Sequence, residues 1–323
     1  MSIMKKILTK FNGLHFRQEY LCLARESLQR SIHAYLVIDR EVIKDITNSH
    51  VFTGYSPLIF TLTSSDLQEP LPDIEIFFSQ QSLEPNDFFE EKDALAGLSL
   101  RLIQKQKIDN NEIYYYEGTR GQHHFLALFH QYILGLNNQL YNRKKGNVFL
   151  NNDLYRQVQI AYSVPRIISL VTVGHDGLYN LFPTDLHGPL NEQYYVSSLR
   201  LGGEACKQVH TIGKIVISQV HADAFRTVYA LGKNHMQELQ PKASLAFSES
   251  LSSGFGLPLP QSTLKYQELS LFESFDHGIH KLLLYKIISN HIVRNDPSTL
   301  AHIHNCYATW RYRHGLPGNY LLR

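Results

Sequence analysis

The stretch VPRIISLVTVGHDGLYNLFPT, residues 164–184, decides the fold of the second half of this 323-residue chain. Pro165 ends a preceding helix candidate, and residues 166–173 form a run of apolar and β-branched residues that is typical of a strand. The four residues 174–177, Gly-His-Asp-Gly, predict a hairpin turn at the end of this run.

Working outward from this hairpin, the second half is predicted to be rich in strands with short helices beside them. Such a pattern indicates a barrel or an α+β domain rather than a doubly wound sheet. The expected strands are 194–199, 214–220, 269–272 and 281–291, and the expected helices are 154–162, 206–211 (ending at Gly213) and 222–231.

The first half mixes both kinds of element, and we expect an N-terminal α+β domain of unrecognised type over residues 1–150, followed by a second domain over 151–323. Apolar spacing predicts helices at 19–30 and 125–141. Strands are predicted at 34–38, 58–62, 74–78 and 112–116, the last ended by Gly118 and Gly121.

Composition excludes several classes of protein. The formal charge of +2 arises from 31 basic and 29 acidic residues without a long run of either sign, so no nucleic-acid or anionic-membrane partner is indicated. The longest clean apolar stretch is too short to span a bilayer, and no secretory signal is visible. The three cysteines are far apart, which fits a reducing, cytoplasmic location.

Several ordered segments of the second half resemble the flavin reductase-like family, whose fold is an FMN-binding split β-barrel with flanking helices. Residues 164–173 are similar to the family's opening Pro-x-x-x-x-Leu-Val-Thr strand, and residues 177–190 to its Gly-x-x-Asn-x-x-x-x-Ser segment. Residues 195–200, 208–218, 256–260 and 278–287 resemble later segments in the same order. The chain departs from the family pattern at Ser218, Ile279 and Tyr285.

The resemblance implies that FMN is the cofactor and that the segment 180–188 lines the flavin. Its polar members would meet the pyrimidine edge, although Asp185 serves equally well to cap a turn. Phe182 and His187 are candidates for the ring walls, as is Tyr312 from a partner subunit, with core packing as the alternative for each. The segment's candidates are Asn180, Leu181, Phe182, Pro183, Thr184, Asp185, His187 and Gly188.

Ser198 and Arg200 are the predicted phosphate pair. They would point to one face of a strand, with Ser197 on the other, and hydroxyl and guanidinium groups suit a phosphate. Ser218 stands where the family has Asn and is a further candidate. The alternative is an exposed strand with ordinary polar alternation.

His280 is the candidate catalytic residue, because it resembles the family histidine beside flavin and nicotinamide. A strand histidine held by packing is the alternative. No metal site is expected: His302, His304 and Cys306 alternate along an expected strand, but chance clustering is expected among 17 histidines.

The resemblance implies a flavin reductase that passes hydride from NAD(P)H to flavin, as a homodimer and with a flavin-dependent monooxygenase partner. Two other hypotheses stay open. The protein is a non-catalytic FMN-binding electron carrier, or the barrel is degenerate and the first 150 residues are an interaction or regulatory module.

Overall fold

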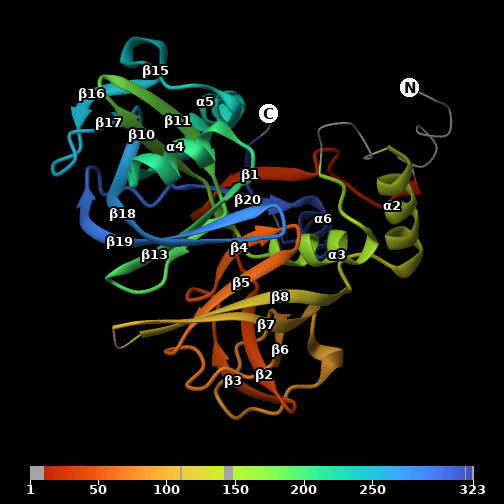
Figure 1. Ribbon diagram of the computed structural model, residues 1–323. Coiled ribbons are helices and arrows are strands. Elements are labelled where there is room, and N and C mark those ends of the chain that lie inside the picture. The colour runs from red at the N-terminus through yellow and green to blue at the C-terminus, as the bar shows by residue number, and fades with distance from the viewer. Residues whose placement is uncertain (1–10, 110, 142–147, 317, 322–323) are drawn as a thin grey trace. The chain divides into compact units, whose positions relative to one another are not determined.

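The computed structural model describes residues 11–109, 111–141, 148–316 and 318–321, and the chain divides into two compact units (Figure 1). Unit 1 takes in residues up to 21, residues 29–164 and residues 303–317. Unit 2 takes in residues 22–28, residues 165–302 and the residues from 318. The predicted domain boundary near residue 150 stays a prediction, and it falls inside the long central segment of unit 1.

Unit 1 is built on a seven-stranded antiparallel sheet in the order β3-β2-β6-β7-β8-β5-β4. Its strands are β2 (His33–Ile38), β3 (Glu41–Asp45), β4 (Val51–Tyr55), β5 (Leu58–Thr63), β6 (Asp73–Ser79), β7 (Ala96–Ile108) and β8 (Asn111–His123). Its helices are η2 (Glu91–Asp93), α2 (Leu128–Tyr141), α3 (Asn152–Ala161) and α6 (Asn305–Arg313).

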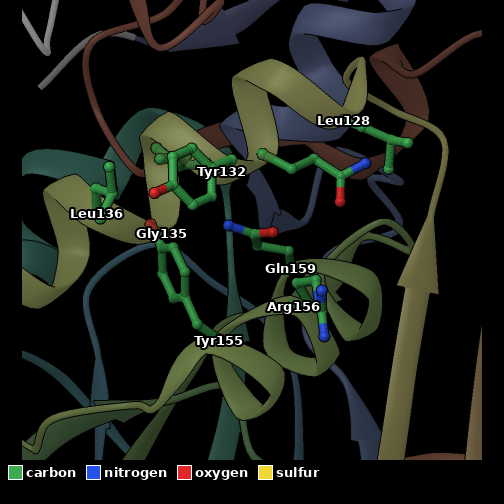
Figure 2. Close-up of a pocket in the computed structure, with 9 residues that line it drawn as sticks. Leu128, Tyr132, Gly135, Leu136, Tyr155, Arg156 and Gln159 are labelled. Carbon is green, nitrogen blue, oxygen red and sulfur yellow. The ribbon is translucent and has the colours of Figure 1, made fainter.

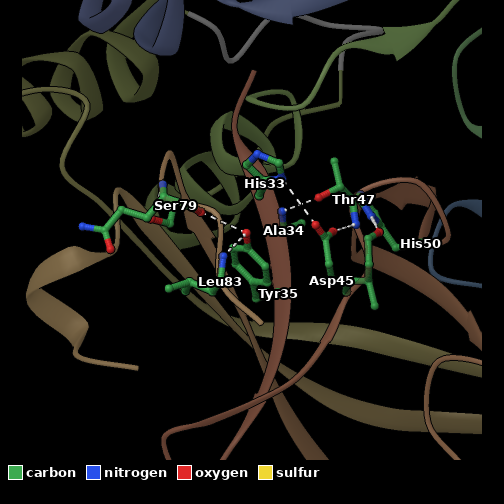
Figure 3. A network of polar contacts seen from close by, with 10 residues as sticks. His33, Ala34, Tyr35, Asp45, Thr47, His50, Ser79 and Leu83 are labelled. Carbon is green, nitrogen blue, oxygen red and sulfur yellow. Dashed lines mark hydrogen bonds and ion pairs between the residues drawn. The ribbon is translucent and has the colours of Figure 1, made fainter. Parts of the chain in front are cut away.

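Polar contacts tie the loops of unit 1 to β2, the second strand from one edge of the sheet (Figure 3). The Thr47 hydroxyl accepts a hydrogen bond from the Ala34 amide at 2.8 Å, and Asp45 accepts one from the Thr47 amide at 2.8 Å. The Tyr35 hydroxyl accepts from the Leu83 amide at 3.0 Å, and burial raises the pKa of this tyrosine. Loop backbone groups thus find partners without a neighbouring strand.

Unit 2 is built on an eight-stranded antiparallel sheet in the order β12-β13-β19-β18-β14-β10-β11-β15. The described chain is mainly β, as predicted, and the split-barrel closure stays a prediction. The strands of this sheet are β10 (Ser169–His175), β11 (Leu178–Thr184), β12 (His187–Pro189), β13 (Tyr194–Arg200), β14 (Lys214–Val220), β15 (Gln240–Pro241), β18 (Thr263–His277) and β19 (His280–Ile292).

Smaller elements complete unit 2. A four-stranded sheet has the order β21-β1-β20-β9, and β16 pairs with β17. These strands are β1 (Tyr20–Ala24), β9 (Arg166–Ile167), β16 (Phe247–Leu251), β17 (Pro258–Pro260), β20 (Leu300–His304) and β21 (Tyr320–Leu321). The first two residues of β1 and the last two of β20 belong to unit 1. The helices are η1 (Arg25–Ser27), α4 (Glu204–Ile212), η3 (Ala222–Ala224), α5 (Phe225–Ala230), η4 (Leu231–Met236) and η5 (Lys242–Ser244).

Local sequence explains the sharp turns of unit 2. Asp176 and Gly177 have φ angles of 51° and 79°, which is the two-residue turn expected between β10 and β11. Gly213 ends α4 with a φ of 71°, and its amide donates to the Val209 carbonyl.

The helix predicted over residues 19–30 is wrong, because β1 and the short η1 occupy this stretch. Leu21, Cys22 and Leu23 are buried in succession, so no single helical face is apolar. Cys22 and Leu23 pair instead with β21. Tertiary pairing therefore decides this ambiguous segment.

The strand predicted at 112–116 is confirmed, but Gly118 and Gly121 do not end it, since β8 continues to His123. Both glycines lie against Gln157 of α3 within unit 1. A Cβ on Gly121 would lie 2.8 Å from Gln157 Cγ, and one on Gly118 would overlap Gln157 Oε1. These glycines let the helix approach the strand closely.

Candidate functional site

One face of the eight-stranded sheet of unit 2, called the inner face here, carries a buried apolar cluster. Val171, Phe182, Ile217 and Leu283 belong to this cluster. The helix α4 packs on the same face, at the end of the sheet where β13 finishes and β14 begins (Figure 1). The helix contributes Ala205, Cys206 and Val209 to the cluster. One end of the inner face is therefore filled by a helix.

A cavity of about 300 Å³ lies at the other end of the inner face. Its floor is buried and its rim is exposed, because Ser169 and Ile217 are buried whereas Lys265 and Asn290 are exposed. Pockets that bind small molecules are typically of this size or larger and have mostly apolar walls. The lining residues used below are Ser169, Tyr195, Ile217, Gln219, Lys265 and Tyr266.

Two polar atoms in this cavity are buried and have no hydrogen-bond partner among the described residues: Ser169 Oγ and Gln219 Oε1. The two residues face each other across the β10–β14 pair. A buried polar atom without a partner costs about 1–3 kcal/mol. A ligand that supplies hydrogen-bonding groups here would recover this free energy.

A hydrogen bond between two uncharged side chains lies beside the cavity. The Tyr195 hydroxyl and His187 Nδ1 are 2.6 Å apart. Desolvation lowers the pKa of His187 to about 4, although the nearby Asp185 opposes this shift, and burial raises the pKa of Tyr195. The imidazole is therefore neutral at pH 7, and its Nδ1 accepts from the tyrosine hydroxyl.

The predicted flavin segment begins at the helix-covered end of the inner face, not in the cavity. The Asn180 amide donates to Gln208 Oε1 of α4 at 2.7 Å and to the Asn234 carbonyl at 3.0 Å. Leu181 and Phe182 are fully buried. These three residues hold α4 and η4 to the sheet, as does Pro183, whose carbonyl accepts from His235 Nε2 at 2.8 Å.

The end of the same segment reaches the cavity end of the sheet. Thr184 pairs with the cavity residue Ser169 across the β10–β11 hairpin. Gly188 pairs with Val196, and Pro189 of the same short strand lines the cavity.

Asp185 takes part in a chain of hydrogen bonds. Its carboxylate accepts from His302 Nδ1 at 2.7 Å, and the other ring nitrogen of His302 contacts the Tyr229 hydroxyl. The two predicted roles of Asp185, flavin contact and turn cap, stay predictions.

Ser198, Arg200 and His280 are brought together, but away from the cavity. Ser198 Oγ lies 3.4 Å from His280 Nδ1, and Arg200 pairs with His280 across β13 and β19. His280 lies five residue steps along β19 from Tyr285, whose partner is the cavity residue Tyr195. At roughly 3.3 Å per residue this is about 17 Å.

His280 is fully buried, and its pKa is lowered to about 4, chiefly by desolvation and further by His277 and Arg200. It is a neutral imidazole within the sheet. Ser197, on the inner face, donates to the Tyr285 hydroxyl at 3.2 Å. Ser218 lies on the opposite face and pairs with Leu170, and its buried hydroxyl has no partner among the described residues.

The sequence reasoning did not select Ser169, Gln219, Lys265 or Tyr266. The available signal was weak: Ser169 is the first residue of β10 and interrupts the apolar run of residues 167–173, and Gln219 interrupts that of β14. A polar residue at an inward position of a buried strand is informative because it is uncommon there.

Two other predictions bear on residues outside the eight-stranded sheet. Cys306 lies in α6, whereas β20 ends at His304, so His302, His304 and Cys306 do not alternate along one strand as predicted. Tyr312 belongs to unit 1 and stacks on His15 with ring centroids 3.7 Å apart. In the described part of the chain no helix is long and apolar enough to cross a membrane.

No protein-family model matches this chain, and no curated protein matches it significantly. Part of the chain is similar to solved structures at low identity. One is the NADH:FAD oxidoreductase SgcE6 of Streptomyces globisporus C-1027, at 11% identity, covering 47% of this chain and 89% of that chain with a TM-score of 0.39.

Two further similar structures have related descriptions. BorF, the flavin reductase component of a bacterial two-component tryptophan halogenase, is 16% identical and covers 48% of this chain and 95% of its own, with a TM-score of 0.40. An FMN-binding protein from Thermus thermophilus is 17% identical and covers 41% of this chain and 74% of its own, with a TM-score of 0.37.

Proposed function

We propose that unit 2 binds FMN in the cavity of its inner face and acts as a flavin reductase. The observation that carries this proposal is the pair of unpartnered buried polar atoms, Ser169 Oγ and Gln219 Oε1, in a cavity with aromatic and apolar walls. The family resemblance of the sequence pointed to the same cofactor, and the cavity supplies a different place for it.

The residues of the cavity fit the three parts of FMN. Tyr195 and Ile217 offer walls for a flat ring. Ser169 and Gln219 offer hydrogen-bonding groups to the polar edge of that ring. The cavity accommodates the ring system, while the ribityl phosphate would reach the exposed rim, where Lys265 supplies a cation.

Bound FMN would supply the hydride acceptor, and the chain would supply orientation and a water-poor surrounding. The buried floor made by Ser169 and Ile217 excludes water from one side of the ring. The Tyr195–His187 pair is neutral at pH 7, so it places no fixed charge against the ring.

Flavin binding is tested by titrating the full chain with FMN and following the quenching of flavin fluorescence. Two matched variants, Lys265→Gln and Arg200→Gln, distinguish the cavity from the phosphate site predicted from sequence. We expect Lys265→Gln to weaken FMN affinity about fivefold, because an exposed charge-assisted contact is lost, and Arg200→Gln to leave it unchanged.

The opposite result, a weaker affinity only for Arg200→Gln, would place the phosphate at Ser198 and Arg200 and refute the cavity. If the wild-type chain binds no FMN, the flavin proposal fails altogether. Riboflavin, which lacks the phosphate, should bind equally to the wild type and to Lys265→Gln.

Reductase activity is tested separately by adding NADH or NADPH to the FMN-loaded protein without oxygen. Loss of the visible flavin absorbance supports a reductase. A loaded protein that is inert to both nucleotides would instead be an electron carrier. The burial of His280 far from the cavity favours this second candidate, because it removes the predicted catalytic histidine from the flavin.

The remaining proposals concern assembly and location. A homodimer and a flavin-dependent monooxygenase partner accompany the reductase proposal, and the cytoplasm is the proposed location. Light scattering of the purified chain tests the dimer: a single species at the monomer mass would refute it.

A further inference from the structure

Unit 1 contains a second cavity, of about 210 Å³, between α2 and α3 (Figure 2). Leu134 and Tyr132 of α2 line one side, and Tyr155, Arg156 and Gln159 of α3 line the other. Two more leucines of α2, Leu128 and Leu136, complete the apolar wall. Nothing in the proposed flavin chemistry uses this cavity.

The side-chain amide of Gln159 carries two N–H donors that no described group accepts. The residue is 1% exposed. Its Oε1 accepts from His123 Nε2 at 2.9 Å, which orients the amide, and its Nε2 has no partner among the described residues. In Figure 2 this nitrogen is directed toward the side on which the rings of Tyr132 and Tyr155 lie. A buried amide nitrogen in this position requires an acceptor.

Arg156 provides a third donor. Its Nη2 donates to Asp153 Oδ1 at 2.9 Å, whereas its Nε is buried and has no partner within the described residues. The other oxygen of Asp153 accepts from Gln157 Nε2 at 2.6 Å. The carboxylate is therefore already in use, and one edge of the guanidinium remains for another acceptor.

Among the described residues, the remaining polar groups around the cavity do not supply that acceptor. His123 is a buried neutral imidazole whose pKa is lowered to about 4 by desolvation. The side chain of Tyr155 is hydrogen-bonded to Glu19, so Tyr155 offers its ring to the cavity. The Gln131 amide donates to the carbonyls of His123 and Leu126, at 2.9 and 2.8 Å.

We propose that this cavity binds a small monocarboxylic acid with a single apolar ring. The carboxylate accepts hydrogen bonds from Gln159 Nε2 and Arg156 Nε, and the ring packs among Tyr132, Tyr155 and the leucines of α2. The volume suits this class, because an apolar cavity of roughly 150 Å³ in another protein binds benzene, and the additional space here matches a carboxylate. Drug-sized ligands need roughly 300 Å³ or more.

Isothermal titration calorimetry of the full chain with benzoate and phenylacetate tests this site, with benzamide as the neutral counterpart of benzoate. We expect one of the two acids to bind, and benzamide to bind at least tenfold more weakly than benzoate. A neutral amide presents one acceptor oxygen without charge, and its own donors would face those of Gln159 and Arg156.

The variant Gln159→Glu should abolish acid binding. The glutamate keeps one oxygen that accepts from His123, but a second oxygen replaces the amide nitrogen and its two N–H donors. Gln122→Glu makes the same chemical change at an exposed position of β8 and should bind as the wild type does. Arg156→Gln, at a half-exposed side chain, should weaken binding about tenfold and serves as the test if Gln159→Glu fails to fold.

The proposal is overturned if neither acid binds to the wild type, if benzamide binds as tightly as benzoate, or if a folded Gln159→Glu binds as tightly as Gln122→Glu. Thermal unfolding of each variant shows which ones are folded. FMN titration is independent of these outcomes, because the FMN cavity lies within unit 2.

Discussion

His123 makes unit 1 sensitive to acid in a way that can be worked out from its surroundings. Desolvation lowers its folded-state pKa to about 4 from the ordinary value of 6.5. Between pH 6.5 and pH 4 the unfolded chain binds a proton at this imidazole and the folded chain does not. Stability therefore falls as the pH falls through this window. From pH 7 to pH 5 the loss attributable to His123 is about 2 kcal/mol.

The assay is urea unfolding at pH 7 and pH 5, followed by tryptophan fluorescence. Trp310 is the sole tryptophan of the chain and lies in α6 of unit 1, so its emission reports the unit that contains His123. At a slope of about 2 kcal/mol per molar urea, the effect of His123 is a midpoint change of roughly 1 M.

Two variants isolate this contribution from that of other titrating groups. In His123→Asn the side chain at position 123 is uncharged at every pH. The free energy of unfolding of this variant should therefore fall by about 2 kcal/mol less than that of the wild type between pH 7 and pH 5. His124→Asn makes the same change at the exposed neighbour, and its free energy of unfolding should fall between pH 7 and pH 5 by as much as that of the wild type. Equal losses for wild type and both variants would refute the reasoning that His123 is neutral because it is buried.

Two further predictions concern packing. A Cβ on Gly254 would lie 2.5 Å from Glu268 Oε2, and this carboxylate accepts hydrogen bonds from the Gly254 and Phe255 amides. Gly254→Ala should therefore lower the stability of unit 2 by about 1–3 kcal/mol, which would be measured as a lower melting temperature. Gly232→Ala is the control: a Cβ there meets no atom within 4 Å, so the melting temperature should stay unchanged. The three cysteines are buried thiols, so the native protein should react with a thiol reagent only after denaturant is added; rapid labelling of the native protein would contradict their burial.

Elements specified by neighbouring residues were predictable from the sequence. The β10–β11 hairpin follows from Asp176 and Gly177, whose backbone angles few other residues tolerate. The helix α3 follows from its apolar spacing, and Asn151 caps it by accepting from the Leu154 amide at 2.8 Å.

Elements specified by distant partners were not predictable. β1 forms because Cys22 and Leu23 pair with residues some 300 positions later in the chain. α6 was not predicted, because the helix is buried on most sides and shows no apolar stripe: Tyr307 and Arg311 are both fully buried.

Only the neighbourhood of the candidate site was predictable from the sequence. The sequence indicated β10, β11 and β13, which do border the cavity. It could not show that α4 covers one end of the inner face, where Gln208 of α4 accepts a hydrogen bond from the Asn180 amide, while Ser169 lines a cavity at the other end. Which end of a strand is open depends on packing between segments far apart in the chain.

The division of the chain between the two units has a consequence for biosynthesis. Residues 22–28 and those from 318 belong to unit 2, whereas residues 303–317 belong to unit 1. A ribosome releases the chain in order, and domains commonly fold as they emerge. Here unit 1 lacks the buried helix α6 until residues 305–313 have been translated, long after the strands of its sheet. The nascent protein would then carry an unfilled apolar core while residues 165–304 are made, a period in which chaperones have an exposed surface to bind.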